Sequence, residues 1–222
     1  RTFVNYTVSN IDHRHVGLEL GTEVNLGKGL NANFALAHGQ YYYTDRMKAT
    51  ITQDNNAEVL ASDETIYSKD FYFATGPQTA MSAGLYYRAK KFWSVSLTGN
   101  LFANNWIDFN PARRTVAGVE LLEDGSDRQY IIDQQKADAQ FTLDLFAMKS
   151  WRVSDLINGF RRNTFLVLNL GISNLLDNQE MIVTGFEQLR FDYTDKNPNK
   201  FPPKYYYGFG RTYFASIIVR FN

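Results

Sequence analysis

The residues most able to do chemistry are two histidines near the start of the chain, in the run Asp12-His13-Arg14-His15. Side chains two positions apart lie on the same side of an extended strand, so both imidazoles could ligate one metal ion if further ligands converged on them. A solvated turn between strands is the plainer interpretation of the same residues. We therefore predict no metal site here.

Catalytic residues are not recognisable in the sequence. Glu19 and Glu23 fall on one side of a strand, but four residues of strand separate them by about 13 Å, too far for a pair of catalytic carboxylates. The chain also lacks Cys, a G-x-S-x-G nucleophile elbow, a glycine-rich phosphate loop and an H-E-x-x-H helix motif. We expect neither an enzyme nor a bound cofactor.

Composition narrows the class of protein. The 222 residues carry 23 Lys and Arg against 23 Asp and Glu, so no positive charge excess points to nucleic acid as a partner. No apolar run approaches the roughly 18 residues of a membrane-spanning helix. Aromatic residues make up 15% of the chain, with 14 Tyr and 17 Phe, and such residues favour strands and membrane interfaces.

The hydrophobic residues recur at every second position, which is typical of strands with one apolar face. In the last eleven residues, Tyr213, Ile217 and Phe221 fall on one side of the strand, and Thr212 and Ser216 fall on the other. Eight segments show this alternation: 4–8, 16–26, 30–43, 79–87, 93–101, 139–147, 166–172 and 211–221.

Short and long connections alternate between these predicted strands. The short ones are Gly27-Lys28-Gly29, Lys90-Lys91 and a compact 151–163 segment in which Ser154 could cap one helical turn. The long ones cover about 48–76, 110–137 and 175–210. Short turns at one end and long loops at the other are typical of outer-membrane β-barrels, although a soluble β-sandwich or lipocalin-like barrel also alternates.

Several runs resemble the distal barrel of TonB-dependent outer-membrane receptors. They are Gly76-Pro77-Gln78-Thr79, Leu85-Tyr86-Tyr87-Arg88, Phe92-Trp93, Asn100-Leu101-Phe102, Ile107-Asp108-Phe109-Asn110-Pro111, Arg113-Arg114-Thr115, Asn169-Leu170-Gly171-Ile172-Ser173-Asn174-Leu175-Leu176-Asp177 and Gly210-Arg211-Thr212-Tyr213-Phe214. The resemblance covers nearly the whole chain. It rests on scaffold motifs, so it indicates the family and says little about the ligand.

The resemblance implies that residues 1–222 are the C-terminal part of an antiparallel transmembrane β-barrel of about 22 strands, without the plug domain. Such receptors lie in the cell outer membrane and import iron chelates, cobalamin or glycans. The implied partners are outer-membrane lipid, the plug and remaining strands of the parent protein, and the TonB complex through the plug. The barrel-assembly machinery would recognise the last strand, where Phe221 is penultimate rather than final.

A large parent barrel also agrees with the predicted inward side chains. Small polar residues such as Asn31, Asn33, Ser96, Thr98 and Asn100 suit a wide, water-filled bore, whereas a small barrel must fill its own interior. Two alternatives stay open. One is a self-contained eight-stranded outer-membrane barrel with a structural or adhesive role, and the other is a soluble β-barrel that binds a ligand.

The best candidates for ligand contact are aromatic and basic residues at the expected extracellular ends of the strands. Aromatic faces stack on sugars or macrocycles, and guanidinium groups pair with carboxylates. Tyrosines of a membrane-interface girdle would occur at the same heights without binding a ligand. The candidates are Tyr41, Tyr42, Tyr43, Trp106, Arg113, Arg114, Tyr205, Tyr206 and Tyr207.

Overall fold

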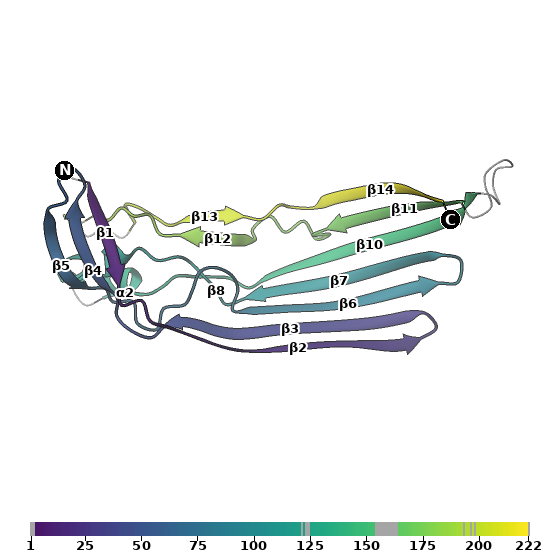
Figure 1. The fold of residues 1–222 in the computed structure, drawn as a ribbon, viewed down its shortest axis with the longest axis horizontal. Coiled ribbons are helices and arrows are strands. Elements are labelled where there is room, and N and C mark those ends of the chain that lie inside the picture. Colours follow the sequence, from purple (N-terminus) through teal and green to yellow (C-terminus); the bar gives the residue numbers. More distant parts are fainter. Residues whose placement is uncertain are drawn as a thin grey trace.

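A computed structural model describes residues 3–120, 122, 125–153, 164–192, 194, 195, 197 and 199–221. Its largest element is an antiparallel sheet of seven long strands (Figure 1). In sheet order these are β14 (Thr212–Phe221), β11 (Thr164–Ser173), β10 (Gln140–Arg152), β7 (Trp93–Ala103), β6 (Thr79–Ala89), β3 (Leu30–Tyr43) and β2 (His13–Gly27). The prediction of an all-β, antiparallel fold is confirmed.

One face of the long sheet is apolar across its whole width. The strand registers align one row of side chains that crosses all seven strands: Val24, Ala32, Leu85, Leu97, Leu145, Ile172 and Tyr213. No other layer of the described residues covers this face, since Leu97 is 39% exposed, Leu170 47% and Ile217 71%. Packing against another layer of the described residues therefore does not explain why these side chains are apolar.

The opposite face carries small and polar side chains on β2, β3, β6 and β7 and at the start of β10. The neighbouring row contains Glu23, Asn33, Gly84, Thr98 and Asp144. We call this the polar face.

Hydrogen bonds between side chains link neighbouring strands on the polar face. The amide of Asn100 donates to the carboxylate of Asp144 at 2.9 Å and to the hydroxyl of Thr142 at 3.3 Å. The alternation weakens toward β14, because Phe146 and Phe214 also lie on this face.

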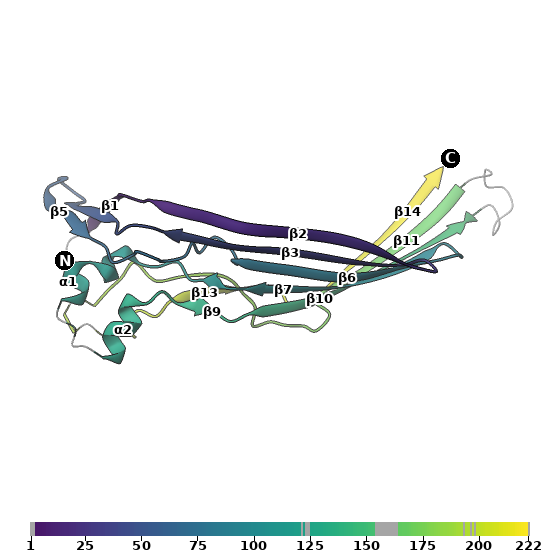
Figure 2. The ribbon, with the colours of Figure 1, turned by 90° about the horizontal axis from the view of Figure 1, so that it is seen from below.

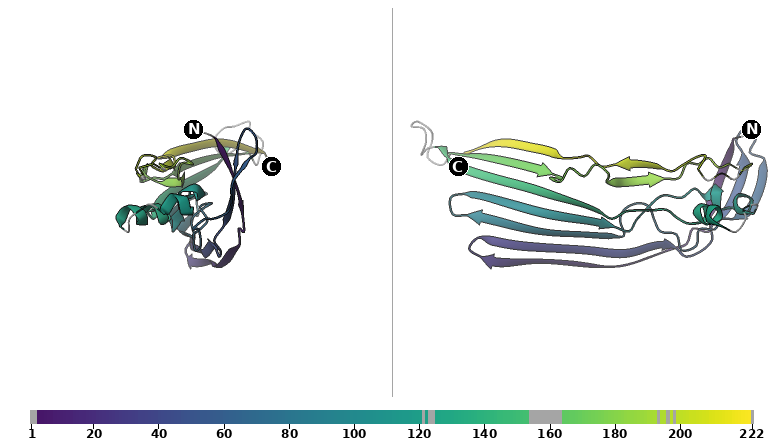
Figure 3. Two further views of the ribbon diagram at one scale, coloured as in Figure 1. Left: turned by 90° about the vertical axis from the view of Figure 1, so that its left-hand side faces the viewer. Right: turned by 180° about the vertical axis from the view of Figure 1, so that it is seen from behind.

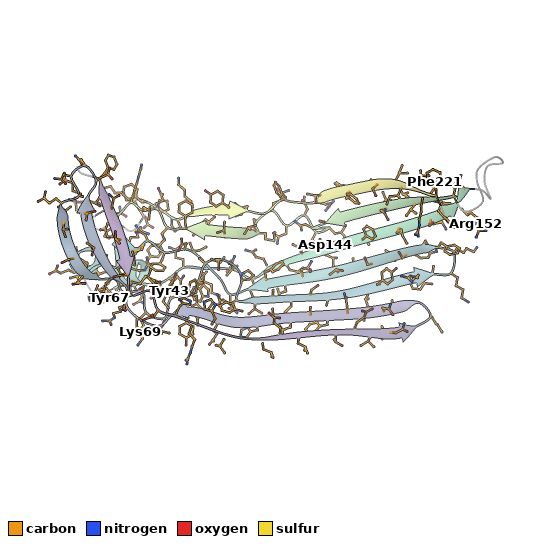
Figure 4. All side chains as sticks on the ribbon, in the orientation of Figure 1. Tyr43, Tyr67, Lys69, Asp144, Arg152 and Phe221 are labelled. Atoms are coloured by element: carbon orange, nitrogen blue, oxygen red, sulfur yellow. The ribbon has the colours of Figure 1, made fainter. Side chains whose placement is uncertain are left out.

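The short turns and the C-terminal strand end lie together at one end of the sheet (Figure 1). The backbone φ is positive at Gly27, Lys28 and Gly29 in the β2–β3 turn. Glycine adopts a positive φ without strain, which suits the first and third of these positions. A Cβ atom at Gly29 would also collide with the carbonyl oxygen of Arg88. Arg152 and Phe221 mark this turn end in Figure 4, and Tyr43 and Tyr67 mark the opposite, loop end.

The long connections are folded rather than irregular, and with β1 they form a layer at the loop end that we call the cap (described residues of 3–12, 44–78, 104–139 and 174–211). Its sheets are β1 (Val4–Ser9), β4 (Lys48–Gln53) and β5 (Val59–Thr65); β8 (Asn105–Trp106) and β9 (Lys136–Ala137); β12 (Ile182–Phe186) and β13 (Lys204–Tyr207). Its short helices are η1 (Pro111–Arg114), α1 (Val116–Val119) and α2 (Ser126–Ile132).

The hydrophobic core of the described residues lies in the cap. Met47, Ala49, Ile66 and Phe109 form a buried cluster, against which Tyr43 also packs. Every buried hydrophobic side chain of the described residues comes from positions 47–137, and none belongs to a strand of the long sheet. The cap is thus organised like a small globular layer, whereas the long sheet is not.

Two predictions need correction. The segment around Val4, Tyr6 and Val8 alternates as predicted, but β1 pairs with β4 in the cap, so the long sheet has seven strands and not eight. Its apolar side instead packs on the core around Met47 and Ala49. The predicted polar loops contain strands and helices, and Ala49 and Ile66 of the first loop are buried in that same core. The helical turn predicted at Ser154 lies outside the described residues.

The long sheet is open in this structure. Among the described strands, β2 and β14 form its two edges, where β2 pairs with β3 and β14 pairs with β11. The self-contained eight-stranded barrel is therefore not formed. Views across the sheet show it curved and twisted rather than flat (Figures 2 and 3). Within the described residues, no helix has the length and hydropathy of a membrane span.

Candidate binding surfaces at the loop end

Capping residues in the local sequence determine the conformation of the segment that carries Arg113 and Arg114. The side chain of Asn110 accepts a hydrogen bond from the Ala112 amide at 2.9 Å, and Pro111 occupies the first helical position of η1. The hydroxyl of Thr115 then accepts from the Gly118 amide at 3.2 Å, which caps α1. Asn110 and Thr115 therefore cap η1 and α1 in succession.

Arg114 forms a bidentate ion pair with Glu187, a residue 73 positions further along the chain. Its Nη1 and Nη2 atoms lie 2.6 and 2.7 Å from the two carboxylate oxygens. The side chains of both residues are almost fully buried, at 0% and 2% exposed. Arg113 lies beside the same carboxylate, with its Nη1 atom 3.9 Å from Oε2.

Arg114 connects three loops of the cap. Its guanidinium donates to the carbonyl oxygens of Ile132 at 3.2 Å and Asp133 at 2.8 Å, and it lies over the ring of Phe71 at 5.0 Å. Its carbonyl oxygen accepts from the Tyr67 amide at 2.8 Å. Phe71, Asp133 and Glu187 belong to three different loops. The Arg114 side chain therefore contacts all three loops of the cap.

Burial shifts the pKa values of neighbouring groups. Loss of solvent raises the pKa of the Asp108 carboxyl, and the nearby Glu187 carboxylate raises it further. Loss of solvent lowers the pKa of Arg113, although Glu187 opposes that shift. Arg113 and Arg114, which were predicted to contact a ligand, are only 1% and 0% exposed and lie inside the cap with Glu187. Ligand contact by these two residues stays a prediction.

The three consecutive tyrosines of β3 separate between the two faces. Tyr42 lies on the side of the apolar face and is near Tyr72, with ring centroids 6.1 Å apart. Tyr72 stacks on Trp106 at 4.6 Å and 7°, and the Lys136 ammonium lies 5.5 Å from the Trp106 ring. These residues form an aromatic surface with one cation at the base of the cap.

Tyr41 and Tyr43 lie on the side of the polar face, where they join a chain of rings. Tyr43 is 4.5 Å from Phe73, and Tyr41 is 5.0 Å from His15. His13 and His15 are 4.9 Å apart. A membrane girdle faces lipid, so these rings on the polar face are not explained as girdle residues.

The tyrosines of β13 lie on the hairpin that contacts the rest of the cap. The hydroxyl of Tyr205 donates to the side-chain oxygen of Gln135 at 3.1 Å, and partial burial raises its pKa. Tyr206 stacks on Phe186 at 6.0 Å, and Tyr207 is 57% exposed. The predicted ligand-contact residues thus occupy several surfaces rather than one pocket, and ligand contact at the tyrosines and Trp106 stays a prediction.

Sequence reasoning missed the residues that organise these surfaces. Glu187 follows a short alternating segment and carries no motif, so nothing local marks it as the partner of Arg114. Tyr72, Phe73 and Lys136 lie in segments predicted to be polar loops. Only their distances in the folded chain show that they pack against predicted site residues.

The described residues contain no group of three or more His, Cys, Asp or Glu side chains that could hold a metal ion. Comparison of the chain with protein-family models, curated proteins and solved structures gives no match. The resemblance to TonB-dependent receptors therefore rests on the residues of this chain alone.

Proposed function

We propose that this chain forms part of the wall of an outer-membrane β-barrel, as the distal strands of a TonB-dependent receptor that imports a scarce nutrient. In this role the apolar face contacts lipid and the polar face lines the bore, where the plug domain sits. The cap forms part of the extracellular vestibule. The chain contributes a scaffold and a binding surface, and no catalytic step.

The observation that carries the proposal is an in-register sheet whose apolar face has no core beneath it. A soluble sheet buries its apolar side chains against a second layer. Here the buried core lies in the cap, while Leu97, Leu170 and Ile217 stay exposed on the long sheet. Lipid acyl chains would cover such a face without any additional protein layer.

The open edges of the sheet also support the proposal. β2 has 15 residues and β14 has 10, and no other strand of the described residues pairs with the outer side of either. Long unpaired edges promote aggregation, and closure into a barrel removes them. We propose that remaining strands of the parent protein pair with both edges and complete the barrel.

A pair of adjacent substitutions tests the lipid-facing role. Leu97 and Thr98 are neighbours on β7 but point to opposite faces of the sheet. Leu97→Arg should destabilise the membrane-inserted chain by about 2–4 kcal/mol, because the charge would face the middle of the bilayer. Thr98→Arg should have a much smaller effect, because its side chain would meet water.

The measurement is urea unfolding of the purified chain in phospholipid vesicles, followed by tryptophan fluorescence. Equal losses of stability in the two variants would contradict lipid contact. Recovery of a folded, monodisperse chain from aqueous buffer without detergent would favour the soluble binder instead.

A further inference from the structure

His13 and His15 form a pair of exposed imidazoles on one face of one strand. β2 is regular at this point and pairs His13 with Tyr43 and His15 with Tyr41. Side chains at positions i and i+2 of a strand project in the same direction. The two imidazole centroids lie 4.9 Å apart, close enough for two nitrogen atoms to approach one metal ion.

Neighbouring groups restrict the orientation of both rings. The Phe73 ring packs at a steep angle against both, with its centroid 5.4 Å from that of His13 and 5.2 Å from that of His15. The Nδ1 atom of His13 lies 3.4 Å from the carbonyl oxygen of Ile11. When Nδ1 donates to this carbonyl, the lone pair lies on Nε2, which is the arrangement that a metal-binding histidine uses.

We propose that His13 and His15 bind a divalent transition-metal ion, with Cu²⁺ bound most tightly. Neutral imidazole is a favourable ligand for copper, nickel and zinc, and affinities at such sites follow the order Co²⁺ < Ni²⁺ < Cu²⁺ > Zn²⁺. Within the described residues, no third His, Cys, Asp or Glu completes the site. The remaining coordination positions are therefore filled by water or by donor atoms of a chelator.

This site goes beyond the proposed transport role and does not depend on it. The two histidines lie on the side of the polar face at the loop end, where a metal complex could reach them from the vestibule. Cu²⁺ binding by a chain that is folded and monodisperse in aqueous buffer without detergent would refute the transport proposal alone. A chain that inserts but does not bind Cu²⁺ would refute only the metal site.

The chain offers a matched control, because its sequence contains three histidines in all. His38 lies on β3 with its Nδ1 atom 2.8 Å from the Thr79 hydroxyl. We expect His13→Gln and His15→Gln each to weaken Cu²⁺ binding on the order of 10²-fold, since the second imidazole otherwise binds within the same molecule. His38→Gln should leave the affinity unchanged.

Titration of the full chain in detergent micelles with Cu²⁺ alone would give the affinities, and electron paramagnetic resonance would count the bound nitrogen atoms. Two equivalent nitrogens in the parent chain, and one in each single variant, are the expected result. Circular dichroism would verify that the variants keep their strand content. Unchanged affinity in the His13→Gln/His15→Gln double variant, or an equal loss in His38→Gln, would overturn the proposal.

Discussion

Replacing Glu187 with Gln is the sharpest perturbation of the cap. The amide has nearly the shape of the carboxylate but carries no charge, so it leaves the buried Arg114 and Arg113 guanidinium groups without their shared counter-charge. The substitution also weakens the hydrogen bond that the Asn110 amide donates to Oε2 at 2.9 Å. The three loops joined at this point should then separate more readily.

The expected loss follows from the geometry of the pair. Removal of one partner from a buried ion pair costs about 3–5 kcal/mol, because the other charge stays buried. A Coulomb estimate agrees, since opposite charges about 4 Å apart interact by about 4 kcal/mol at an effective dielectric constant near 20. We therefore expect the free energy of opening the cap to fall by about 3–5 kcal/mol.

Amide hydrogen exchange reports this loss at the affected residues. The Glu187 amide donates to the Asp108 carbonyl at 2.8 Å, and the Tyr67 amide donates to the Arg114 carbonyl at 2.8 Å. In the Glu187→Gln variant both amides should exchange at least about 10²-fold faster, since every 1.4 kcal/mol changes an equilibrium tenfold. Amides in the middle of β7 should not change.

Glu180→Gln is the matched control, because it removes the same charge from an exposed position in the same loop. Its effect should stay within about 0.5 kcal/mol. The reasoning fails if Glu187→Gln accelerates exchange less than tenfold, or if both variants behave alike.

Three further outcomes are expected. Burial raises the pKa of Asp108, so the folded protein holds this proton more tightly than the unfolded chain does. The contribution of Asp108 to cap stability should therefore fall as pH rises from about 4 through that raised pKa. Asp108→Asn should abolish this pH dependence, measured by hydrogen exchange of cap amides. Gly29→Ala should cost about 1–3 kcal/mol in urea unfolding, because φ is +84° and a Cβ atom would meet backbone, whereas Gly21→Ala meets nothing within 4 Å and should cost much less. Tyr205→Phe should cost about 0.5–1.5 kcal/mol of cap stability through the lost hydrogen bond to Gln135, measured by exchange of cap amides.

The strands of the long sheet could be predicted because their pattern is local. The predicted segments 79–87 and 93–101 correspond to β6 (Thr79–Ala89) and β7 (Trp93–Ala103), and the turn at Gly27-Lys28-Gly29 lies where expected. Alternation separates the side chains of a strand between two faces, and the seven long strands share the same two faces. That shared condition makes the pattern strong.

Alternation does not identify the sheet to which a strand belongs. Val4, Tyr6 and Val8 show a weak form of the same alternation, yet β1 packs on the cap core. The cap itself depends on contacts between distant residues. Met47, Ile66 and Phe109 are single apolar residues in polar surroundings, and only the folded chain brings them together.

Only part of the candidate site could be predicted from the sequence, because part of it depends on contacts between distant residues. Aromatic residues at strand ends mark a surface, so Tyr41, Tyr43 and Trp106 could be selected from the sequence. The burial of Arg114 could not, because its partner Glu187 is 73 residues away and has no local signature. The separation of neighbouring tyrosines onto two faces follows from the strand register.

Site-specific labelling tests most directly whether the apolar face contacts lipid. The chain has no cysteine, so one label can be placed at Leu97→Cys, Thr98→Cys, Asp144→Cys or Leu145→Cys without a background signal. With a bimane label on the chain in vesicles, brominated phospholipid should quench the fluorescence at positions 97 and 145, and aqueous iodide should quench it at 98 and 144. Equal quenching by lipid at all four positions, or none at 97 and 145, would contradict the account.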